Sequence, residues 1–377
     1  MSNPLQQLNA ADQAVWLDFV DRKFLKEGGL KKLIENDALT GVTSNPSIFE
    51  KAMGQGDAYD DGFKEWLKTA KADASVTDTY EAQAIVDIQS AADDLRPVYD
   101  RLKAQDGYVS LEVSPYLAND TKATIEEARR LWKQVDRPNL MIKVPGTEAG
   151  APAVRQLLEE RLNINITLLF SQEAYHQVAE AHLAALEARV KAGKPIDKIA
   201  SVASFFVSRI DSKIDSKIDE RVKGGDKDAA ALKAVRGKVA IANAKLAYVW
   251  WQDMIASDRW KALEAKGAMP QRLLWASTST KDPDYPETMY VDNLIGPDTV
   301  NTIPPATMDA FRKTGKVAPT LTQDVEGAKK VLAEAEGLGL DLNRVTANLV
   351  EEGVKKFADA ADKLLEAVGK KRKAMVG

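Results

Sequence analysis

The sequence predicts an α/β protein built as a single (β/α)8 barrel with extra helices, and three observations lead to this fold class. Short apolar runs alternate with amphipathic helical stretches along the chain of 377 residues. The apolar runs are continuous, which is typical of parallel strands covered on both faces. Eight such units fit a (β/α)8 barrel, which commonly takes ~250 residues or more. A doubly wound open sheet is the alternative, but no Gly-x-Gly-x-x-Gly sequence follows any apolar run.

Eight apolar runs are the predicted strands, and each ends in polar residues, glycine or proline. In chain order they are Ala14–Leu17, Leu39–Thr43, Tyr108–Val113, Leu140–Ile142, Ile164–Phe170, Ile199–Ala203, Arg272–Trp275 and Thr288–Val291. Amphipathic helical stretches separate the strands. Ser171 is the predicted N-cap of the helix after the fifth strand, and that helix is predicted to end near Gly193.

Two separating segments, 45–106 and 204–271, are longer than one helix requires. Neither carries a strand signal, so we expect helical insertions within one barrel domain that spans residues 1–377. The second segment contains the repeat IDSKIDSKID at 210–219, which predicts a helix with one isoleucine face and a solvated charged face. A last amphipathic helix is predicted over 349–368, followed by a frayed basic tail.

Composition limits the chemistry and the partners of the chain. The net charge of −4 gives no sign of nucleic-acid binding. The absence of cysteine and the presence of only two histidines exclude thiolate nucleophiles and leave too few ligands for a zinc site. The N-terminus lacks a secretory signal, and no apolar run approaches the ~20 residues of a membrane span. We therefore expect a cytoplasmic protein without a cysteine- or histidine-based metal site, and the sequence gives no sign of an obligate protein partner.

Ionisable side chains near the ends of the predicted strands are the candidate catalytic groups, because a barrel carries its reactive groups at the carboxyl ends of its strands. Lys143 follows an apolar strand, and burial favours the neutral amine that can attack a carbonyl carbon. The alternative is a structural lysine that reaches the solvent or pairs with a carboxylate. Glu112 alternates with apolar residues, so it is predicted to point inward, either for proton transfer or for an ion pair with Lys143. Asp18 is a second inward acid or a cap on the next turn.

Polar residues on the later strands complete the candidate site. Asn165 and Thr167 lie two apart on one strand face, where they bind substrate hydroxyls or fill the barrel. Ser204 and Arg209 flank a predicted helix start, which suits a phosphate group, although a surface arginine is the alternative. A lysine, two acids and an anion site describe Schiff-base chemistry on a phosphorylated carbonyl compound. These features do not choose between an aldolase, a transaldolase and a dehydratase.

Seven segments, in order along the chain, resemble the transaldolase family in its long bacterial branch. They are Thr40–Ser47, Val109–Ser114, Leu140–Thr147, Asn165–Phe170, Ala203–Arg209, Trp275–Lys281 and Tyr290–Pro297. The resemblance covers nearly the whole chain and implies a class I aldolase-type TIM barrel without a fused glucose-6-phosphate isomerase. It implies transfer of a dihydroxyacetone unit from sedoheptulose 7-phosphate or fructose 6-phosphate to glyceraldehyde 3-phosphate or erythrose 4-phosphate. This reaction belongs to the pentose phosphate pathway and uses no cofactor.

The resemblance also implies catalytic roles for four residues. Lys143 would form the Schiff base from the fourth strand. Glu112 and Thr167 would hold a water molecule that relays protons while the imine forms and breaks. Asp18 would take and return the proton of the hydroxyl group at the bond that is cleaved.

Binding roles follow from the same resemblance. Asn45 and Asn165 would hydrogen-bond the dihydroxyacetone portion, and Phe206 would shape the site near the lysine. Ser204 and Arg209 would bind the phosphate group. Shorter members of the family carry a second phosphate-binding arginine after the seventh strand, and the corresponding stretch of this sequence offers Lys281.

Two rival functions share this fold. A fructose-6-phosphate aldolase would protonate the enamine and release it. That branch has shorter chains, with Gln and Tyr where this sequence has Glu112 and Phe206, so both residues favour transfer. A sugar-phosphate sensor without turnover would be expected to lack Lys143 or Glu112, and both are present.

Overall fold

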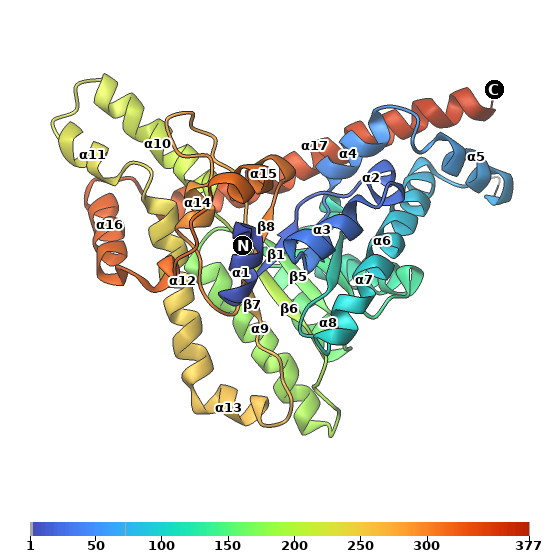
Figure 1. The fold of residues 1–377 in the computed structure, drawn as a ribbon, viewed down its shortest axis with the longest axis horizontal. Coiled ribbons are helices and arrows are strands. Elements are labelled where there is room, and N and C mark those ends of the chain that lie inside the picture. Colours follow the sequence, from blue (N-terminus) through green and yellow to red (C-terminus); the bar gives the residue numbers. More distant parts are fainter. Residues whose placement is uncertain (1–2, 72, 377) are drawn as a thin grey trace.

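The centre of the molecule is a closed barrel of eight parallel strands (Figure 1), as a computed structural model that describes residues 3–71 and 73–376 shows. Each strand pairs with the next in chain order, and the last pairs with the first. The strands are β1 (Gln13–Leu17), β2 (Gly41–Val42), β3 (Tyr108–Glu112), β4 (Leu140–Pro145), β5 (Ile164–Leu169), β6 (Ser201–Phe206), β7 (Arg272–Ala276) and β8 (Thr299–Ile303). The predicted (β/α)8 fold is therefore confirmed.

The prediction for the eighth strand is wrong. The residues predicted as that strand, Thr288–Val291, lie almost entirely in the short helix α14 (Met289–Asp292), where the Thr288 hydroxyl donates to Asp292 Oδ2 at 2.6 Å. The strand β8 begins eleven residues after the start of the predicted strand. Its buried polar residues Thr299 and Asn301 interrupt the apolar run that marks the other strands. A short run of apolar residues does not by itself distinguish a strand from a buried helical turn.

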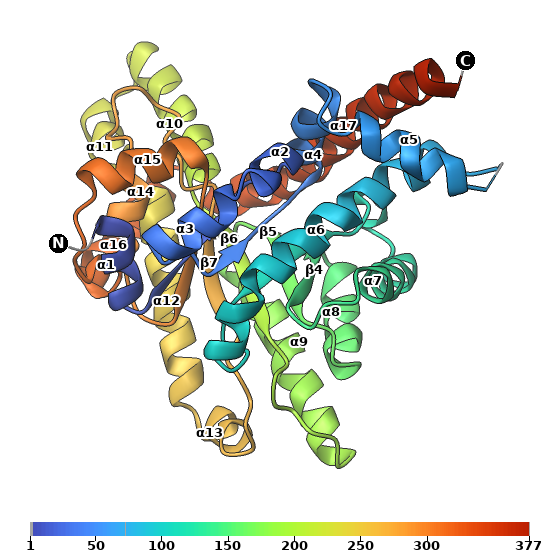
Figure 2. The same cartoon turned by 45° about the vertical axis from the view of Figure 1, so that its right-hand side comes forward.

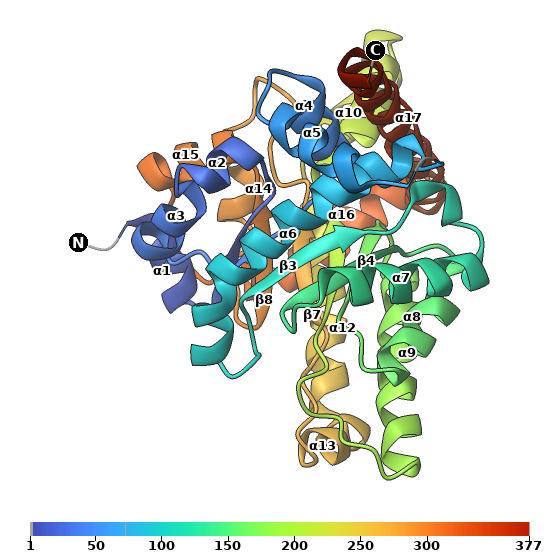
Figure 3. The same ribbon diagram turned by 90° about the vertical axis from the view of Figure 1, so that its right-hand side faces the viewer.

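Helices surround the barrel, and several of them project beyond its two ends (Figures 2 and 3). Ser171 is confirmed as the N-cap of α9, since its hydroxyl accepts a hydrogen bond from the Ala174 amide at 3.1 Å. The remaining helices are α1 (Pro4–Ala10), α2 (Arg22–Lys26), α3 (Gly29–Asp37), α4 (Pro46–Gly54), α5 (Asp60–Thr69), α6 (Val76–Arg101), α7 (Thr121–Val135), α8 (Gly150–Glu159), α9 (Gln172–Lys191), α10 (Ser208–Lys223), α11 (Ala229–Val235), α12 (Val239–Ala256), α13 (Asp258–Glu264), α15 (Pro305–Thr314), α16 (Val325–Gly337) and α17 (Leu342–Val376).

The two long separating segments consist largely of helices. Segment 45–106 contains α4, α5 and α6, and segment 204–271 contains the end of β6 followed by α10 to α13. In Figure 3 the helices α4, α10 and α17 lie at one end of the barrel, and α13 lies at the other. The first of these ends carries the carboxyl termini of the strands, since α4 and α10 directly follow β2 and β6.

The repeat at 210–219 forms the first part of α10. Its isoleucines are fully buried, as predicted. The prediction of a solvated charged face is wrong for the aspartates nearest the barrel. Asp211 accepts from the Ala240 amide at 2.8 Å and from the Tyr290 hydroxyl at 3.0 Å, and both Asp211 and Asp215 are buried. These carboxylates accept hydrogen bonds from backbone amides near the start of α12. Buried amides without such acceptors would reduce the stability of the fold.

The basic side chains of α10 also make contacts within the molecule. Lys213 forms an ion pair with Glu352 of α17 at 2.7 Å. Lys217 Nζ donates to the carbonyl oxygen of Leu340 at 3.3 Å, and Arg221 donates to that of Leu338 at 2.6 Å. The basic face of α10 therefore holds the end of α16 and the start of α17.

The last helix is longer than predicted, and the basic tail is not frayed. Helix α17 runs from Leu342 to Val376 and therefore includes the basic residues at 370–373. Lys371 forms an ion pair with Asp60 at 2.8 Å, and Arg372 donates to the carbonyl oxygen of Ala74 at 2.6 Å. These contacts with α5 and the loop after it stabilise helical structure that the composition alone did not predict. Figure 2 shows α17 passing alongside α4, against which it packs.

Helix α17 approaches the barrel most closely at Gly353. A Cβ atom at this position would lie 2.7 Å from Cδ2 of the buried Leu168. Leu168 itself has a left-handed φ of 62°, within a register irregularity between Ile166 and Leu169 of β5. The helix thus contacts β5 at the carboxyl end of the barrel through a position that has no room for a side chain.

Candidate active site

Strand register brings a lysine and a glutamate together inside the barrel. Lys143 on β4 pairs in register with Glu112 on β3 and with Asn165 on β5. Because residues in register on neighbouring parallel strands face the same side, all three side chains point inward at one level. All three residues are buried. Lys143 Nζ lies 3.2 Å from Glu112 Oε2 and donates to the carbonyl oxygen of Ser44, also at 3.2 Å.

A cavity of about 690 Å³ opens at the carboxyl ends of the strands and reaches Lys143. Its lining includes most of the residues that the sequence indicated: Asp18, Asn45, Lys143, Thr167, Ser204, Phe206, Arg209 and Lys281. Two residues of the predicted site, Glu112 and Asn165, do not line it. They lie behind the cavity wall, where Glu112 contacts Lys143 and Asn165 contacts Ser204.

Glu112 and Thr167 carry buried oxygen atoms that lack hydrogen bonds within the described residues. Lys143 and Glu112 are close enough for an ion pair, but the geometry is not that of a hydrogen bond. Neither oxygen of the Glu112 carboxylate accepts a hydrogen bond within the described residues. Thr167 Oγ1 also makes no hydrogen bond there. Burial raises the pKa of Glu112, and the neighbouring Lys143 opposes this effect. Buried polar atoms of this kind are generally satisfied by an ordered water molecule.

Asp18 approaches the same cavity from the end of β1. Its Oδ1 accepts a hydrogen bond from the Thr43 hydroxyl at 2.8 Å, and Thr43 Oγ1 lies 2.6 Å from Thr302 Oγ1. Burial raises the pKa of Asp18, while Lys143 and the hydrogen bond from Thr43 act in the opposite direction. The predicted alternative of a turn cap receives no support, because the carboxylate lines the cavity and accepts a hydrogen bond from Thr43, the residue that follows β2.

The amide residues of the site differ in how much of their hydrogen-bonding capacity is already used. Asn165 Nδ2 donates to Ser110 Oγ at 3.0 Å, and its Oδ1 accepts from Ser204 Oγ at 2.7 Å. Asn45 caps α4, because its Oδ1 accepts from the Ile48 amide at 3.0 Å. This cap leaves the Asn45 Nδ2 group facing the cavity without a protein acceptor among the described residues.

Two positive side chains of the cavity lining, Arg209 and Lys281, lie close to each other. Arg209 is the second residue of α10, and its guanidinium group lies over the Phe206 ring, 5.1 Å from the centroid. Lys281 follows β7 and donates to Ser279 Oγ at 2.6 Å. Burial and the proximity of Arg209 lower the pKa of Lys281. Like charges held this close in a partly enclosed site favour an anionic ligand.

Helix α17 supplies residues that sequence reasoning missed. Phe357 is buried, and its ring centroid lies 5.8 Å from Lys143 Nζ. Lys356, Asp359 and Lys363 of the same helix also line the cavity. The sequence predicted a helix here, but an amphipathic pattern does not reveal which surface the helix covers. The separation of more than 200 residues from Lys143 left no local signal.

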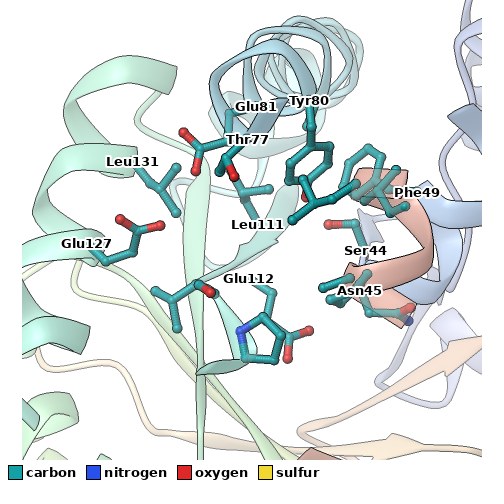
Figure 4. A pocket seen from close by; sticks show the side chains of 18 of the residues that line it. Ser44, Asn45, Phe49, Thr77, Tyr80, Glu81, Leu111, Glu112, Glu127 and Leu131 are labelled. Atoms are coloured by element: carbon teal, nitrogen blue, oxygen red, sulfur yellow. The ribbon is translucent and has the colours of Figure 1, made fainter. Parts of the chain in front are cut away.

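A second, mainly apolar pocket of about 130 Å³ lies on the other side of Glu112 (Figure 4). Phe49 and Tyr80 form part of its wall, with Leu111 of β3 and Leu131 of α7. Glu112 borders this pocket and contacts Lys143, which lines the first cavity. The glutamate is therefore enclosed largely by apolar groups on one side, which accounts for the strong effect of burial on its pKa.

The described residues hold no group of three or more His, Asp or Glu side chains that could bind a metal ion. In the same part of the chain, no helix is long and apolar enough to cross a membrane. A buried lysine beside a carboxylate, at the carboxyl ends of barrel strands and within a cavity that favours anions, is the arrangement that a Schiff-base-forming barrel enzyme requires.

Comparison with known proteins identifies the family within this class. The family model for transaldolase/fructose-6-phosphate aldolase matches residues 15–368. Transaldolase 2 of Nostoc punctiforme is 48% identical over 379 residues, which cover 99% of this chain and 99% of the relative. The transaldolases of Trichodesmium erythraeum and Thermobifida fusca are each 46% identical, over 100% and 98% of this chain and 99% and 98% of their own. The chain belongs to the transaldolase/fructose-6-phosphate aldolase family, and the predicted family and enzyme class are confirmed.

Proposed function

We propose that the chain is a transaldolase that moves a dihydroxyacetone unit from a ketose phosphate to an aldose phosphate through a Schiff base on Lys143. The observation that carries this proposal is the buried Lys143–Glu112 contact of 3.2 Å beside the large cavity. The donors would be sedoheptulose 7-phosphate or fructose 6-phosphate, and the acceptors glyceraldehyde 3-phosphate or erythrose 4-phosphate. Several relatives named transaldolase match this chain over nearly their whole length, and this similarity supports the assignment.

Formation of the Schiff base uses Lys143 and Glu112. The Lys143 ammonium group first passes a proton to Glu112, and the resulting neutral amine attacks the C2 carbonyl carbon of the ketose. The carbinolamine then loses water to give the protonated imine. Glu112 supplies the proton for the leaving water through a water molecule shared with the Thr167 hydroxyl. The unfilled hydrogen-bonding capacity of both side chains supports this role. The raised pKa of Glu112 favours its action as an acid.

Cleavage of the carbon–carbon bond then uses Asp18. This carboxylate takes the proton of the C4 hydroxyl group while the C3–C4 bonding electrons move into the protonated imine. An aldose phosphate leaves, and a three-carbon enamine stays on Lys143. The acceptor aldehyde reacts with the enamine in the reverse sense, and Asp18 returns the proton to the new hydroxyl group. Hydrolysis of the imine releases the new ketose. The protonated imine on Lys143 provides the electron withdrawal, so these steps involve no metal and no organic cofactor.

Substrate binding divides between the two walls of the cavity. Asn45 and Ser204 bind the hydroxyl groups near Lys143, and Asn165 contributes from behind the cavity wall by accepting the Ser204 hydrogen bond at 2.7 Å. Arg209 and Lys281 bind the phosphate group. The hydrogen bond between Ser204 and Asn165 favours a hydroxyl-binding role for this serine over the phosphate-binding role inferred from the sequence. We infer further that this single-domain enzyme acts on sugar phosphates in the cytoplasm, in the pentose phosphate pathway, without nucleic acid, membrane or obligate protein partners.

A fructose-6-phosphate aldolase is the second candidate, because the family includes both activities. The two reactions share every step up to the enamine and differ in whether water or an aldose phosphate then reacts with it. Phe206 favours transfer, because its ring at the edge of the cavity offers no hydroxyl group to activate water or to protonate the enamine carbon.

The deciding experiment measures products from fructose 6-phosphate with and without erythrose 4-phosphate. A transaldolase forms sedoheptulose 7-phosphate and glyceraldehyde 3-phosphate in equal amounts when the acceptor is present, and it releases little free dihydroxyacetone without it. Continuous release of dihydroxyacetone without an acceptor would instead identify an aldolase. The variant Lys143→Met, checked for folding by circular dichroism, should abolish both reactions.

A further inference from the structure

The large cavity that reaches Lys143 carries more positive charge on its lining than the predicted site accounts for. Lys51 of α4 and two lysines of α17, Lys356 and Lys363, line the cavity together with Arg209 and Lys281. The carboxylates on the same cavity lining are Asp18, Glu50 and Asp359. One of these is already engaged, because Asp359 forms an ion pair with Lys355 at 2.7 Å.

Within the described residues, the cations nearest Arg209 lack negative partners. Neither Arg209 nor Lys356 forms an ion pair or donates a hydrogen bond there, and the Lys281 ammonium donates only to the Ser279 hydroxyl. The pKa of Lys356 is lowered, with Arg209 as the largest cause, followed by burial and by Lys281. Like charges that repel one another around a shared space, without a carboxylate in ion-pair contact, form a site that an anion stabilises.

The position of Lys356 is fixed by its neighbours on α17. Gly353, one helical turn earlier, contacts Leu168 of β5. The next residue, Phe357, is buried near Lys143. Glu352 of the same helix is held by Lys213 of α10, the helix that also carries Arg209. The backbone at Lys356 is therefore anchored to both β5 and α10, although the lysine side chain itself is exposed to the solvent in the cavity.

We propose that Lys356 is a specificity-determining residue that binds the substrate phosphate together with Arg209 and Lys281, so that α17 forms part of the substrate site. This inference rests on the proposed function. The ammonium group gives the phosphate dianion a third positive partner from an element that is distant in sequence. It strengthens the binding of phosphorylated sugars and adds nothing to the binding of the neutral sugar portion.

The test compares Lys356→Met with Lys370→Met. Lys370 lies on the same helix and pairs with Glu366 at 2.6 Å, and it does not line the cavity, so the second variant controls for the change in net charge. We expect Lys356→Met to raise the KM for fructose 6-phosphate about tenfold and to change kcat less than about twofold, because a charge-assisted contact to phosphate is lost. The value of kcat/KM for fructose should stay within about twofold, and Lys356→Arg should restore most of the affinity.

Calorimetric titration with inorganic phosphate gives a second readout that needs no turnover. Lys356→Met should weaken phosphate binding about tenfold, and Lys370→Met should leave it unchanged. Unchanged phosphate binding in Lys356→Met, or equal losses with fructose and fructose 6-phosphate, would overturn the inference. The proposed function is tested separately by borohydride trapping of the wild-type protein with fructose 6-phosphate. A trapped adduct on Lys143 together with an unaffected Lys356→Met variant would reject only the role of Lys356.

Discussion

At the scale of single residues, the two acids of the site differ in what surrounds them. Glu112 lies between an apolar pocket and Lys143, and its oxygen atoms accept no hydrogen bond within the described residues. Asp18 accepts a hydrogen bond from Thr43 and lines the open cavity. This difference suits Glu112 to proton transfer during imine formation and Asp18 to proton transfer during cleavage, and the two steps can therefore be separated by substitution.

The variant Asp18→Asn should form the Schiff base with the ketose but fail to cleave the C3–C4 bond of the bound sugar. An amide cannot accept the C4 hydroxyl proton, so we expect turnover to fall by roughly 10²- to 10⁴-fold. With fructose 6-phosphate and borohydride, mass spectrometry should then find a six-carbon sugar phosphate on Lys143, where the wild-type protein carries three carbons.

Asp359→Asn is the matched control, because Asp359 lines the same cavity and is paired with Lys355. It should give the three-carbon adduct. A three-carbon adduct on Asp18→Asn as well would contradict the role assigned to Asp18.

His182 provides a prediction about stability that is independent of the active site. It is fully buried beside Trp260, and neither ring nitrogen makes a hydrogen bond within the described residues. Burial lowers its pKa to about 4. A histidine of this kind is protonated more readily in the unfolded chain, where its pKa is about 6.5. The folded state therefore loses stability as the pH falls from about 6.5 towards 4.

The expected effect of His182 on the unfolding free energy at pH 5 is a loss of about 2 kcal/mol relative to pH 7.5. The variant His182→Leu keeps the site apolar and of similar size, so its unfolding free energy should fall by about 2 kcal/mol less between pH 7.5 and pH 5 than that of the wild type. Urea denaturation at both pH values measures the two unfolding free energies. An equal pH dependence in the wild type and the variant would show that His182 does not titrate as burial implies.

Several site residues could be predicted because their chemistry contradicts their local pattern. Lys143 and Glu112 are charged residues within apolar strands, and strand register then requires them to meet. Phe357 and Lys356 could not be predicted in this way, because both occupy ordinary positions of an amphipathic helix. Their function depends on where α17 packs, and sequence periodicity carries no information about that.

At the scale of elements, the repeat in α10 gives the helix three faces, each of which contacts a different part of the molecule. Its isoleucines enter the core, its basic side chains hold α16 and α17, and its aspartates bind the start of α12 and the loop before α14. The four-residue period places like residues on the same face at successive turns. The sequence revealed the apolar face, but it could not show that the charged faces would also be covered.

The aspartates of α10 should differ in their contribution to stability according to burial. Asp211→Ala leaves the Ala240 amide and the Tyr290 hydroxyl without an acceptor in a buried site, and we expect a loss of about 2–4 kcal/mol in the unfolding free energy. Asp219 is exposed, and its partner Arg236 keeps a second ion pair with Asp282, so Asp219→Ala should cost less than about 1 kcal/mol. Chemical denaturation of both variants measures this difference, and equal losses would contradict it.

At the scale of the whole molecule, the charge is distributed unevenly. The net charge is −4, yet one wall of the cavity carries Lys51, Arg209, Lys281 and Lys356. The local positive field attracts small anions to the site. The net negative charge of the whole protein is too small to cancel this attraction. The net charge gave no sign of nucleic-acid binding, but it could not locate this field.

Salt should therefore weaken the binding of phosphorylated substrates selectively. Raising sodium chloride from about 50 to about 500 mM shortens the screening length to less than half, and we expect the KM for fructose 6-phosphate to rise several-fold. The kcat/KM for fructose, measured under the same conditions, should change less than about twofold. Similar changes with both sugars would indicate a general effect of salt on the enzyme, with no electrostatic contribution from the cavity wall.

The closed barrel followed from the sequence because successive parallel strands with helical crossovers admit few topologies. The error at β8 did not alter the fold, since the helix α14 and the strand β8 lie in the same connection between β7 and α15. The site required more than topology. Its walls combine strand ends with α4, α10 and α17, and the packing of these helices is decided by contacts between residues far apart in the chain.

The most direct test of the proposed mechanism is borohydride reduction of the protein with fructose 6-phosphate alone, followed by peptide mapping. The mechanism predicts one modified residue, Lys143, carrying the mass of a reduced three-carbon unit that persists until an aldose phosphate is added. An absence of any adduct, or an adduct on a different lysine, would contradict the assignment of Lys143 as the Schiff-base residue.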